Sequence, residues 1–297
     1  MATSVDTTAT SSNRLSAFFY RHHWVKLGAL LAPPLAWFLI FYIGALAVLF
    51  VSAFWHLDTF TGKVVKEFSL QNFQTLFTDP VYRTITIRTV GIAAAVTVTD
   101  IVLAFPLAYY AARLASARSR NAILVAVVLP LWANYVVRIF AWRLILSQGG
   151  FLAWLFSLFG LHVEVGYSQW GIWLTFVYLW LPFTMLPIYA SLERIPTSFL
   201  EASSDLGAKG WLTFRRVVFP MIVPGIVAGS IFSFSLTLGD YIAPTLVGNT
   251  KFIGNVIYDS VGVANNVPFA AAYALVPIAV MTVYMLIAKR AGAFEAL

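Results

Sequence analysis

The sequence predicts an all-α protein, a polytopic membrane helix bundle with six transmembrane helices. Of its 297 residues, 60% are hydrophobic and only 10% are charged, and the mean hydropathy is +0.83. A soluble domain of this size needs a more highly charged surface, so lipid is the solvent of most of the chain. Apolar windows of about 20 residues, the length that crosses a bilayer, occur six times.

The six windows are separated by connections of unequal length. The first is too long for the apolar part of a cleaved signal peptide, so we take it as a retained span. The aromatic run 151–160 is too short to cross a bilayer, and we expect it to lie in the outer interface as a helix. The windows lie near residues 27–54, 90–112, 122–146, 170–192, 221–246 and 269–288.

The distribution of basic residues predicts the orientation, because lysine and arginine are retained on the cytoplasmic side during insertion. With the N-terminus inside, twelve basic residues fall in cytoplasmic segments and seven fall outside. Both termini are therefore expected in the cytoplasm, as tails 1–26 and 291–297 around a membrane domain, residues 27–290. The net charge of +7 is then a topology signal, and no nucleic-acid partner is expected. The chain has no cysteine, and its four histidines lie outside the apolar runs, so no metal site is predicted.

The connection between the fourth and fifth spans, residues 193–219, is cytoplasmic in this topology and unusually polar. Ser198 and Glu201 have the spacing of a capping box, which predicts a short helix beginning at Phe199. Gly207 then ends that helix, because glycine adopts positive φ without strain.

A second short helix is expected over residues 211–218, before Pro220 and Pro224 open the fifth span. The two helices carry apolar residues beside charged ones, and such a projection can dock into a groove of another protein. The alternative is a solvated linker whose charges only set the topology. The capping box and the glycine favour the ordered unit.

The same loop resembles the EAA loop of permease subunits of ATP-binding-cassette importers, whose consensus is Glu-Ala-Ala-x3-Gly-x9-Ile-x-Leu-Pro. The spacing is intact here, with Ser203, Val217 and Phe219 in place of Ala, Ile and Leu. The resemblance implies that the loop supplies coupling helices that sit in a cleft of a partner ATPase. It assigns this coupling role to Glu201, Ala202, Ser203, Asp205, Leu206, Gly207, Arg215 and Pro220.

Two further stretches narrow the resemblance. LGDYIAPTLVGNTKFIGNVI, residues 238–257, is similar to a segment of spermidine/putrescine-type permeases, and LPLWANYVVRIFAWRLIL, residues 129–146, resembles the third span of that family. The likeness covers roughly residues 24–290. It implies the type I importer permease fold and a role in uptake of polyamines or a related cationic solute across a bacterial inner membrane. The implied partners are a cytoplasmic ATPase dimer, a second, related permease and a periplasmic solute-binding protein, besides the membrane lipids.

The chain lacks the Gly-x4-Gly-Lys-Ser/Thr loop that holds nucleotide phosphates, so we expect a transport subunit without enzymatic activity or a bound cofactor. ATP and magnesium are then used by the partner ATPase. One alternative is a secondary transporter or channel, which would need no ordered docking loop. Another is an intramembrane aspartyl protease, in which two carboxylates share a proton. Thr237 in "TLGD" departs from the Gly-x-Gly-Asp motif of those proteases, and the two aspartates are expected at different depths.

Two carboxylates lie in or beside the predicted spans. Asp100 falls near the middle of the second span, where an ionised aspartate costs about 2.5 to 3.5 kcal/mol. Asp240 follows Pro220 by enough helical residues to reach the outer end of the fifth span. A polyamine is an elongated polycation, which carboxylates and aromatic faces attract. The predicted substrate pathway comprises Asp240, Tyr241, Trp132, Asn134 and Asp100.

Both carboxylates also have structural interpretations. The alternative for Asp240 is a cap that accepts hydrogen bonds from the backbone. For Asp100 it is a polar contact between helices, or a protonated side chain bonded to Thr97, and the residues favour this over a substrate role.

The other polar residues near the outer side have similar alternatives. Trp132 is alternatively an interfacial anchor, and Asn134 a residue that hydrogen-bonds between helices. Arg138 would repel a cation, so we expect it to reach the outer interface or to pair with an acid there.

Overall fold

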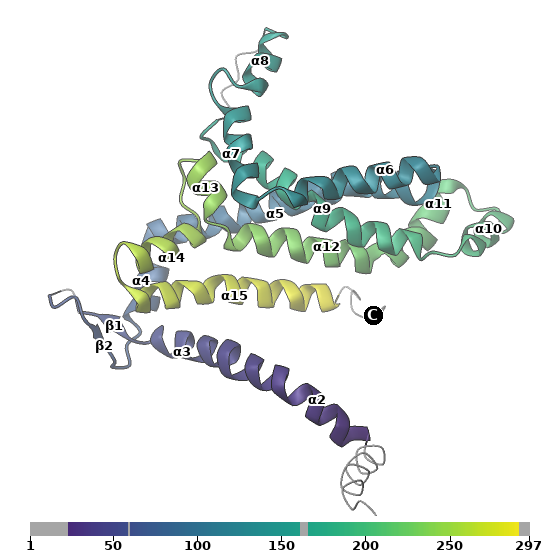
Figure 1. Cartoon of the computed structure of the whole chain (residues 1–297). Coiled ribbons are helices and arrows are strands. Elements are labelled where there is room, and N and C mark those ends of the chain that lie inside the picture. The colour runs from purple at the N-terminus through teal and green to yellow at the C-terminus, as the bar shows by residue number, and fades with distance from the viewer. Residues whose placement is uncertain (1–22, 59, 161–165, 291–297) are drawn as a thin grey trace, which may run out of the picture. The chain divides into compact units, whose positions relative to one another are not determined.

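The computed structural model describes residues 23–58, 60–160 and 166–290 (Figure 1). Residues 1–52 and 53–297 form two compact units, which are described separately. Over the described ranges, six helical runs are long and apolar enough to cross a membrane, which confirms the predicted fold class. Residues 1–22 and 291–297, most of the two predicted tails, lie outside the described residues.

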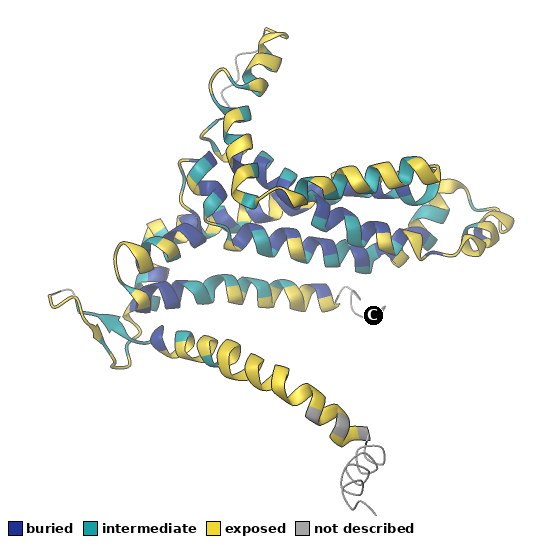
Figure 2. Cartoon of the chain, viewed as in Figure 1, coloured by how far each residue is buried: buried dark blue, intermediate teal, exposed yellow. Residues whose placement is uncertain are grey.

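The first unit contains one long apolar helix. It consists of α2 (His23–Trp37), the π-helical segment η2 (Phe38–Ile43) and α3 (Gly44–Ser52). Pro33 and Pro34 lie inside α2. Nearly all of its described side chains are exposed, as Figure 2 shows, which suits a helix whose surroundings are lipid or another membrane protein.

The second unit begins with a short hairpin and a short helix. Strands β1 (His56–Leu57) and β2 (Val64–Val65) pair antiparallel, and α4 (Gln71–Thr78) follows. The side-chain amide of Asn72 donates to the carbonyls of Ala53 (3.1 Å) and Trp55 (2.7 Å). These buried bonds tie α4 to the start of the hairpin.

Three long helices form the centre of the second unit. They are α5 (Pro80–Tyr109), α9 (Gln169–Glu193) and α12 (Phe219–Gly239), which pack against one another and lie side by side in Figure 1. The π-helical segment η3 (Tyr110–Leu114) extends α5. In α9, 61% of the most apolar window is buried, against 28% for α5 and 39% for α12, so α9 is the central helix.

Two glycines allow α12 to approach α9 closely. Gly225 and Gly229 are four residues apart on one face of α12, the small-residue spacing of tightly packed membrane helices. A Cβ atom on Gly229 would lie 2.8 Å from the Cα and carbonyl oxygen of Thr184. One on Gly225 would lie 2.6 Å from the carbonyl oxygen of Pro187. The contact is therefore between backbones, with no room for a larger side chain.

The third predicted span, residues 122–146, is not one continuous helix. The chain forms α6 (Ala117–Val128), the 3-10 turn η4 (Leu129–Trp132) and α7 (Tyr135–Leu146). Pro130 has no N–H to continue the helix, and Ala133 and Asn134 are extended. The membrane-length run here is Tyr135–Ser157, which adds α8 (Phe151–Ser157), the helix expected over 151–160.

The fifth predicted span also ends earlier than expected. The expectation was residues 221–246, but α12 stops at Gly239, Asp240 is extended, and a separate α13 (Ile242–Val247) follows. Helix α14 (Ile253–Gly262) and the last span, α15 (Val267–Arg290), complete the unit. The hydroxyl of Tyr273 on α15 donates to the carbonyl of Tyr82 (3.1 Å), which joins α15 to α5.

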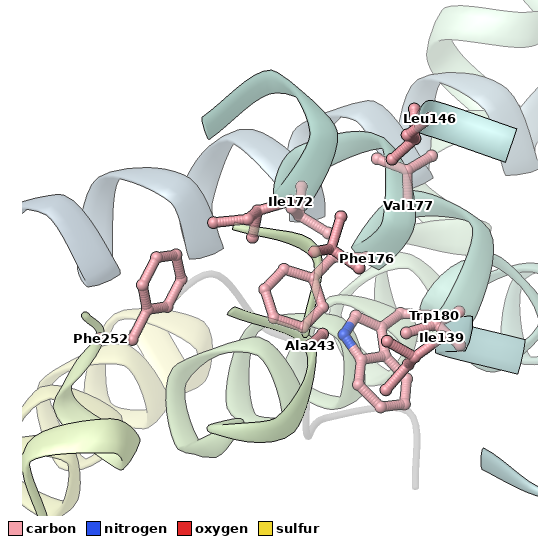
Figure 3. Close-up of a cluster of buried hydrophobic side chains, with 11 residues drawn as sticks. Ile139, Leu146, Ile172, Phe176, Val177, Trp180, Ala243 and Phe252 are labelled. Carbon is pink, nitrogen blue, oxygen red and sulfur yellow. The ribbon is translucent and has the colours of Figure 1, made fainter. Parts of the chain in front are cut away.

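Two groups of buried side chains hold the second unit together. The outer cluster joins α5, α7, α9, α13 and the start of α14, and Figure 3 shows Phe176 and Trp180 of α9 beside Ala243, with Ile139 next to Trp180. The root cluster joins the other ends of α5 and α9 to the start of α12. Its buried members are Ala104, Ala108, Ala111, Met185, Ile188, Tyr189, Leu192, Ile195, Val218 and Ile222.

Between α9 and α12, the loop forms α10 (Thr197–Asp205), α11 (Gly210–Thr213) and the π-helical segment η5 (Phe214–Val218).

Candidate functional site: the 193–219 loop and the membrane carboxylates

The first loop helix begins earlier than the capping-box spacing predicted. Helix α10 starts at Thr197, its N-cap is Pro196, and no side chain caps it by a hydrogen bond. Ser198 therefore lies within the first turn, and its predicted capping bond with Glu201 is wrong. The physical reason is Pro196, whose ring fixes φ at −63°, so the turn begins directly after the buried Ile195.

The end of the same helix is as predicted. Gly207 has a φ of +75°, and the residue before it, Leu206, is the C-cap of α10. The Ala208 N–H donates to the Ser203 carbonyl (3.0 Å), and the Gly207 N–H donates to the Ser204 carbonyl (2.8 Å). These two bonds form a Schellman motif, which satisfies carbonyls that the helix end would otherwise leave unpaired. Gly207 thus sets the direction in which the chain leaves α10.

The second loop helix is not separate from the fifth span. The chain is helical without interruption from Gly210 to Gly239, passing from α11 through η5 into α12. Pro220 has no N–H to donate and lies directly after the π-helical segment, where the i→i−4 hydrogen-bond pattern is already altered. A displacement of α11 therefore acts directly on the fifth span.

The two loop helices are held together and expose apolar side chains. The hydroxyls of Ser203 and Thr213 lie 2.9 Å apart and bridge α10 to α11. Leu206 is 88% exposed and Trp211 71% exposed, and Leu206 lines a groove of about 530 Å³ between α10 and the start of α12. An ordered unit that exposes large apolar side chains is typical of a surface that binds another protein.

The predicted coupling residues gather on this unit. Ser203 is buried in the joint between the helices, whereas the other members are exposed. Glu201, Ala202, Ser203 and Asp205 lie on α10, Leu206 and Gly207 at its end, Arg215 in η5 and Pro220 at the start of α12.

The loop is anchored in the root cluster. Val218 and Ile195, at its two ends, are buried there against α5 and α9. The ring of Phe214 lies 5.6 Å from that of Phe105 on α5. The loop thus stands on packed helices rather than on flexible connections.

Asp240 lies at the break between α12 and α13. One carboxylate oxygen accepts hydrogen bonds from the N–H groups of Ile242 (2.7 Å) and Ala243 (3.0 Å), and the other accepts from the hydroxyl of Tyr135. Asp240 therefore caps the first turn of α13 and also joins it to α7. The backbone cap, which was the alternative to a substrate role for Asp240, is therefore present. A role of Asp240 in the substrate pathway stays a prediction.

Sequence patterns did not identify Tyr135 as the partner of Asp240, or Trp180 as the neighbour of Tyr135. The two rings stack with centroids 5.9 Å apart. The guanidinium carbon of Arg138 lies 5.8 Å from the centre of the Tyr135 ring. Among the described residues no acid pairs with Arg138, so of its two expected arrangements the ion pair is absent. These contacts join α7 to α9 and α12, and no local spacing in the sequence encodes them.

The remaining residues of the predicted pathway make contacts with groups other than the Asp240 carboxylate. Trp132 in η4 is 86% exposed, and the Asn134 side chain caps α7 by accepting from the Val136 N–H (2.9 Å). Tyr241 stacks on Tyr258 of α14 with centroids 4.7 Å apart.

Asp100 is fully buried between α5 and α12. The hydroxyl of Ser233 donates to it (2.6 Å), whereas Thr97 donates instead to the carbonyl of Ala93 (2.7 Å). Of the two structural alternatives for Asp100, the structure therefore contains the polar contact between helices and not the bond to Thr97. Ser233 precedes Asp240 by two helical turns, about 10 Å along α12, so the carboxylates do not form a pair. This separation removes the geometry that an aspartyl protease needs.

Known proteins resemble this chain over most of its length. Residues 155–293 match the family described as "Binding-protein-dependent transport system inner membrane component". The inner membrane ABC transporter permease protein YdcU of Escherichia coli (strain K12) is 44% identical, over 96% of this chain and 95% of that protein. The spermidine/putrescine transport system permease protein PotB of Salmonella typhimurium (strain SL1344) is 32% identical, over 76% and 79%.

Solved structures show the same fold. A chain in the crystal structure of a bacterial alginate ABC transporter, in complex with alginate pentasaccharide-bound periplasmic protein, has a TM-score of 0.76 at 20% identity. The likeness covers 95% of this chain and 98% of that chain. Together with the identity to YdcU and PotB, this shows that the chain belongs to the family of binding-protein-dependent transport system inner membrane components, as a permease subunit of an ABC importer.

Proposed function

We propose that the 193–219 loop is the element through which a partner ATPase drives this permease. The observation that carries the proposal is the fixed two-helix unit. Gly207 sets its bend, the Ser203–Thr213 contact holds its helices together, and Leu206 and Trp211 are exposed on it. An importer permease is not itself an enzyme, so the energy of ATP and magnesium must arrive through such a contact.

The mechanism follows from how the loop is anchored. When the ATPases close on ATP, they pull on α10 and α11. Because α11 is continuous with α12 and the loop ends are buried in the root cluster, the pull tilts α9 and α12 together. The permease then alternates between outward-open and inward-open states. This requires the loop, and therefore both termini, on the cytoplasmic side, as the basic residues predict.

We propose a polyamine or a related cationic solute as the cargo. The similarity to a spermidine/putrescine permease supports this, as does the Asp240 carboxylate, which accepts a hydrogen bond from Tyr135, whose ring stacks on that of Trp180. A carboxylate beside aromatic rings attracts an alkylammonium group. A second, related permease completes the assembly in this proposal, alongside the ATPase pair and the periplasmic solute-binding protein.

The docking proposal is tested by Leu206→Glu and Glu201→Ala. A buried, unpaired carboxylate in an interface costs about 2–5 kcal/mol, so Leu206→Glu should lower the amount of ATPase that co-purifies by about tenfold or more. Glu201→Ala should reduce solute uptake while the protein still inserts. The measurements are ATPase retained on the purified permease and uptake in reconstituted vesicles.

Val263→Glu is the matched control, because Val263 is 81% exposed at the end of α14, far along the chain from the loop. It should retain the wild-type amount of ATPase. Wild-type retention by Leu206→Glu, with wild-type uptake by Glu201→Ala, would refute docking through this loop.

The cargo proposal is tested by Asp240→Asn. Asparagine keeps an oxygen for the N–H groups of Ile242 and Ala243 but removes the negative charge, so α13 should stay capped. We expect the KM for spermidine to rise about fivefold or more, because a charge-assisted contact is lost. Asp259→Asn, which removes a carboxylate from an exposed pair with Lys251 at 2.7 Å, is the control. An unchanged KM in Asp240→Asn would assign Asp240 the capping role alone.

A further inference from the structure

Arg113 connects the second span to the start of the loop. It lies in η3, the π-helical extension of α5, and is half-buried. Its Nη2 donates hydrogen bonds to the carbonyls of Leu192 and Ile195, the latter at 2.7 Å. In the sequence, Arg113 is one of the twelve basic residues that are predicted to lie in cytoplasmic segments.

The two carbonyls stand at the junction between α9 and the loop. Helix α9 ends at Glu193, its C-cap is Arg194, and α10 begins at Thr197, so three residues separate the helices. The last carbonyls of a helix have no partner within it and carry partial negative charge. A guanidinium that bonds one carbonyl on each side of the C-cap fixes the direction in which the chain leaves α9.

Buried surroundings strengthen the hydrogen bonds of Arg113 compared with the nearby ion pair between Arg120 and Glu193. Leu192 and Ile195 are 0% and 3% exposed, so water competes little for these carbonyls. In contrast, Arg120 and Glu193 are 3.8 Å apart with half-exposed side chains, and such a pair contributes little to stability. Arg113 is therefore the principal polar link between the inner end of α5 and the loop.

We propose that Arg113 is a positioning residue for energy coupling: it holds the α9–α10 junction to the inner end of α5, so that a displacement of α10 moves α5 together with α9. This rests on the proposed role of the loop. Without the link, only the apolar packing of Ile195 in the root cluster joins the junction to α5, and most of the motion of the ATPase is lost there before it reaches the second span. Hydrolysis then continues while transport falls.

The test compares Arg113→Ala, Arg113→Gln and Arg113→Lys with Arg118→Ala, a control that removes the same charge from an exposed position on α6. The measured quantity is the number of solute molecules imported per ATP hydrolysed in reconstituted importer. We expect Arg113→Ala and Arg113→Gln to lower this ratio about tenfold while ATPase retention stays at the wild-type level. Lysine, which keeps the charge and can donate to a carbonyl, should restore part of the ratio.

A second readout is independent of the ATPase. The chain has no cysteine, so spin labels can be placed on α10 at Ser204 and on α6 at Ser119 without other changes. In Arg113→Gln the distance distribution between the labels should broaden, and in Arg118→Ala it should match the wild type. Loss of bound ATPase in Leu206→Glu together with a broader distance distribution in Arg113→Gln would support both docking through the loop and the role of Arg113. Retained ATPase in Leu206→Glu with broadening would reject only docking through the loop.

Two results would overturn the role of Arg113. One is a wild-type import ratio in both Arg113→Gln and Arg113→Lys, which decides the matter even if Arg113→Ala fails to fold. The other is an unchanged distance distribution in Arg113→Gln.

Discussion

Valine in place of Gly229 is expected to abolish the folded permease. The new Cβ would lie 2.8 Å from the backbone of Thr184, and a backbone cannot move aside as a flexible side chain can. Overpacking of a well-packed contact costs about 1–3 kcal/mol, and here valine would also separate the two central helices, α9 and α12. The measurement is the amount of monodisperse protein extracted from membranes and its thermal stability in detergent.

Gly91→Val is the matched control for this result. Gly91 is also in a membrane helix, α5, but a Cβ there would meet nothing within 4 Å. It should therefore give near wild-type yield and stability. Equal loss in both variants would mean that valine harms any membrane glycine of this chain, and the close α9–α12 contact would not be the cause.

Proline in place of Gly207 should eliminate transport while the protein still inserts in the membrane. Gly207 has a φ of +75°, whereas proline is held near −65°, and proline also removes the N–H that bonds the Ser204 carbonyl. The Schellman turn cannot form, so α11 leaves α10 in another direction and the docking surface is lost. The effect is measured as solute uptake and as the amount of ATPase retained in reconstituted importer. Loss of the turn should weaken ATPase binding by about 1.4 kcal/mol or more, so both quantities should fall at least about tenfold.

A graded series separates backbone geometry from any other effect at this position. Asparagine tolerates positive φ, so Gly207→Asn should retain most activity, and Gly207→Ala should be intermediate. Gly210→Ala, at a loop glycine with ordinary φ and no close neighbour, should behave as the wild type. Equal activity of the proline and asparagine variants would contradict a role for the left-handed turn.

Local sequence patterns predicted those features that depend on short stretches of chain. Six apolar windows predicted six spans because each span must cover the hydrocarbon thickness by itself. Gly207 was predicted as a helix end because the left-handed conformation depends on one residue and its neighbours. The capping box failed at Ser198 because Pro196, two residues earlier, starts the helix, so two local signals competed and spacing alone could not rank them.

The contacts within the membrane depended on partners far away in the chain. Pro130 is visible in the sequence, but whether it kinks or divides a span depends on what packs on each side, and the structure divides residues 122–146 into α6 and α7. Asp100 could equally have bonded within its own helix. Its partner Ser233 is on α12, 133 residues away.

By itself the sequence determined the class of membrane protein, the number of spans and the position of the bent loop, because burial in lipid and glycine geometry act on a single segment. Only the tertiary structure decided which polar groups meet: Asp240 with Tyr135, Asp100 with Ser233, and Arg113 with the junction between α9 and α10. The physical reason is that a polar group in an apolar surrounding must find a hydrogen-bond partner, and which one it reaches depends on how the helices pack.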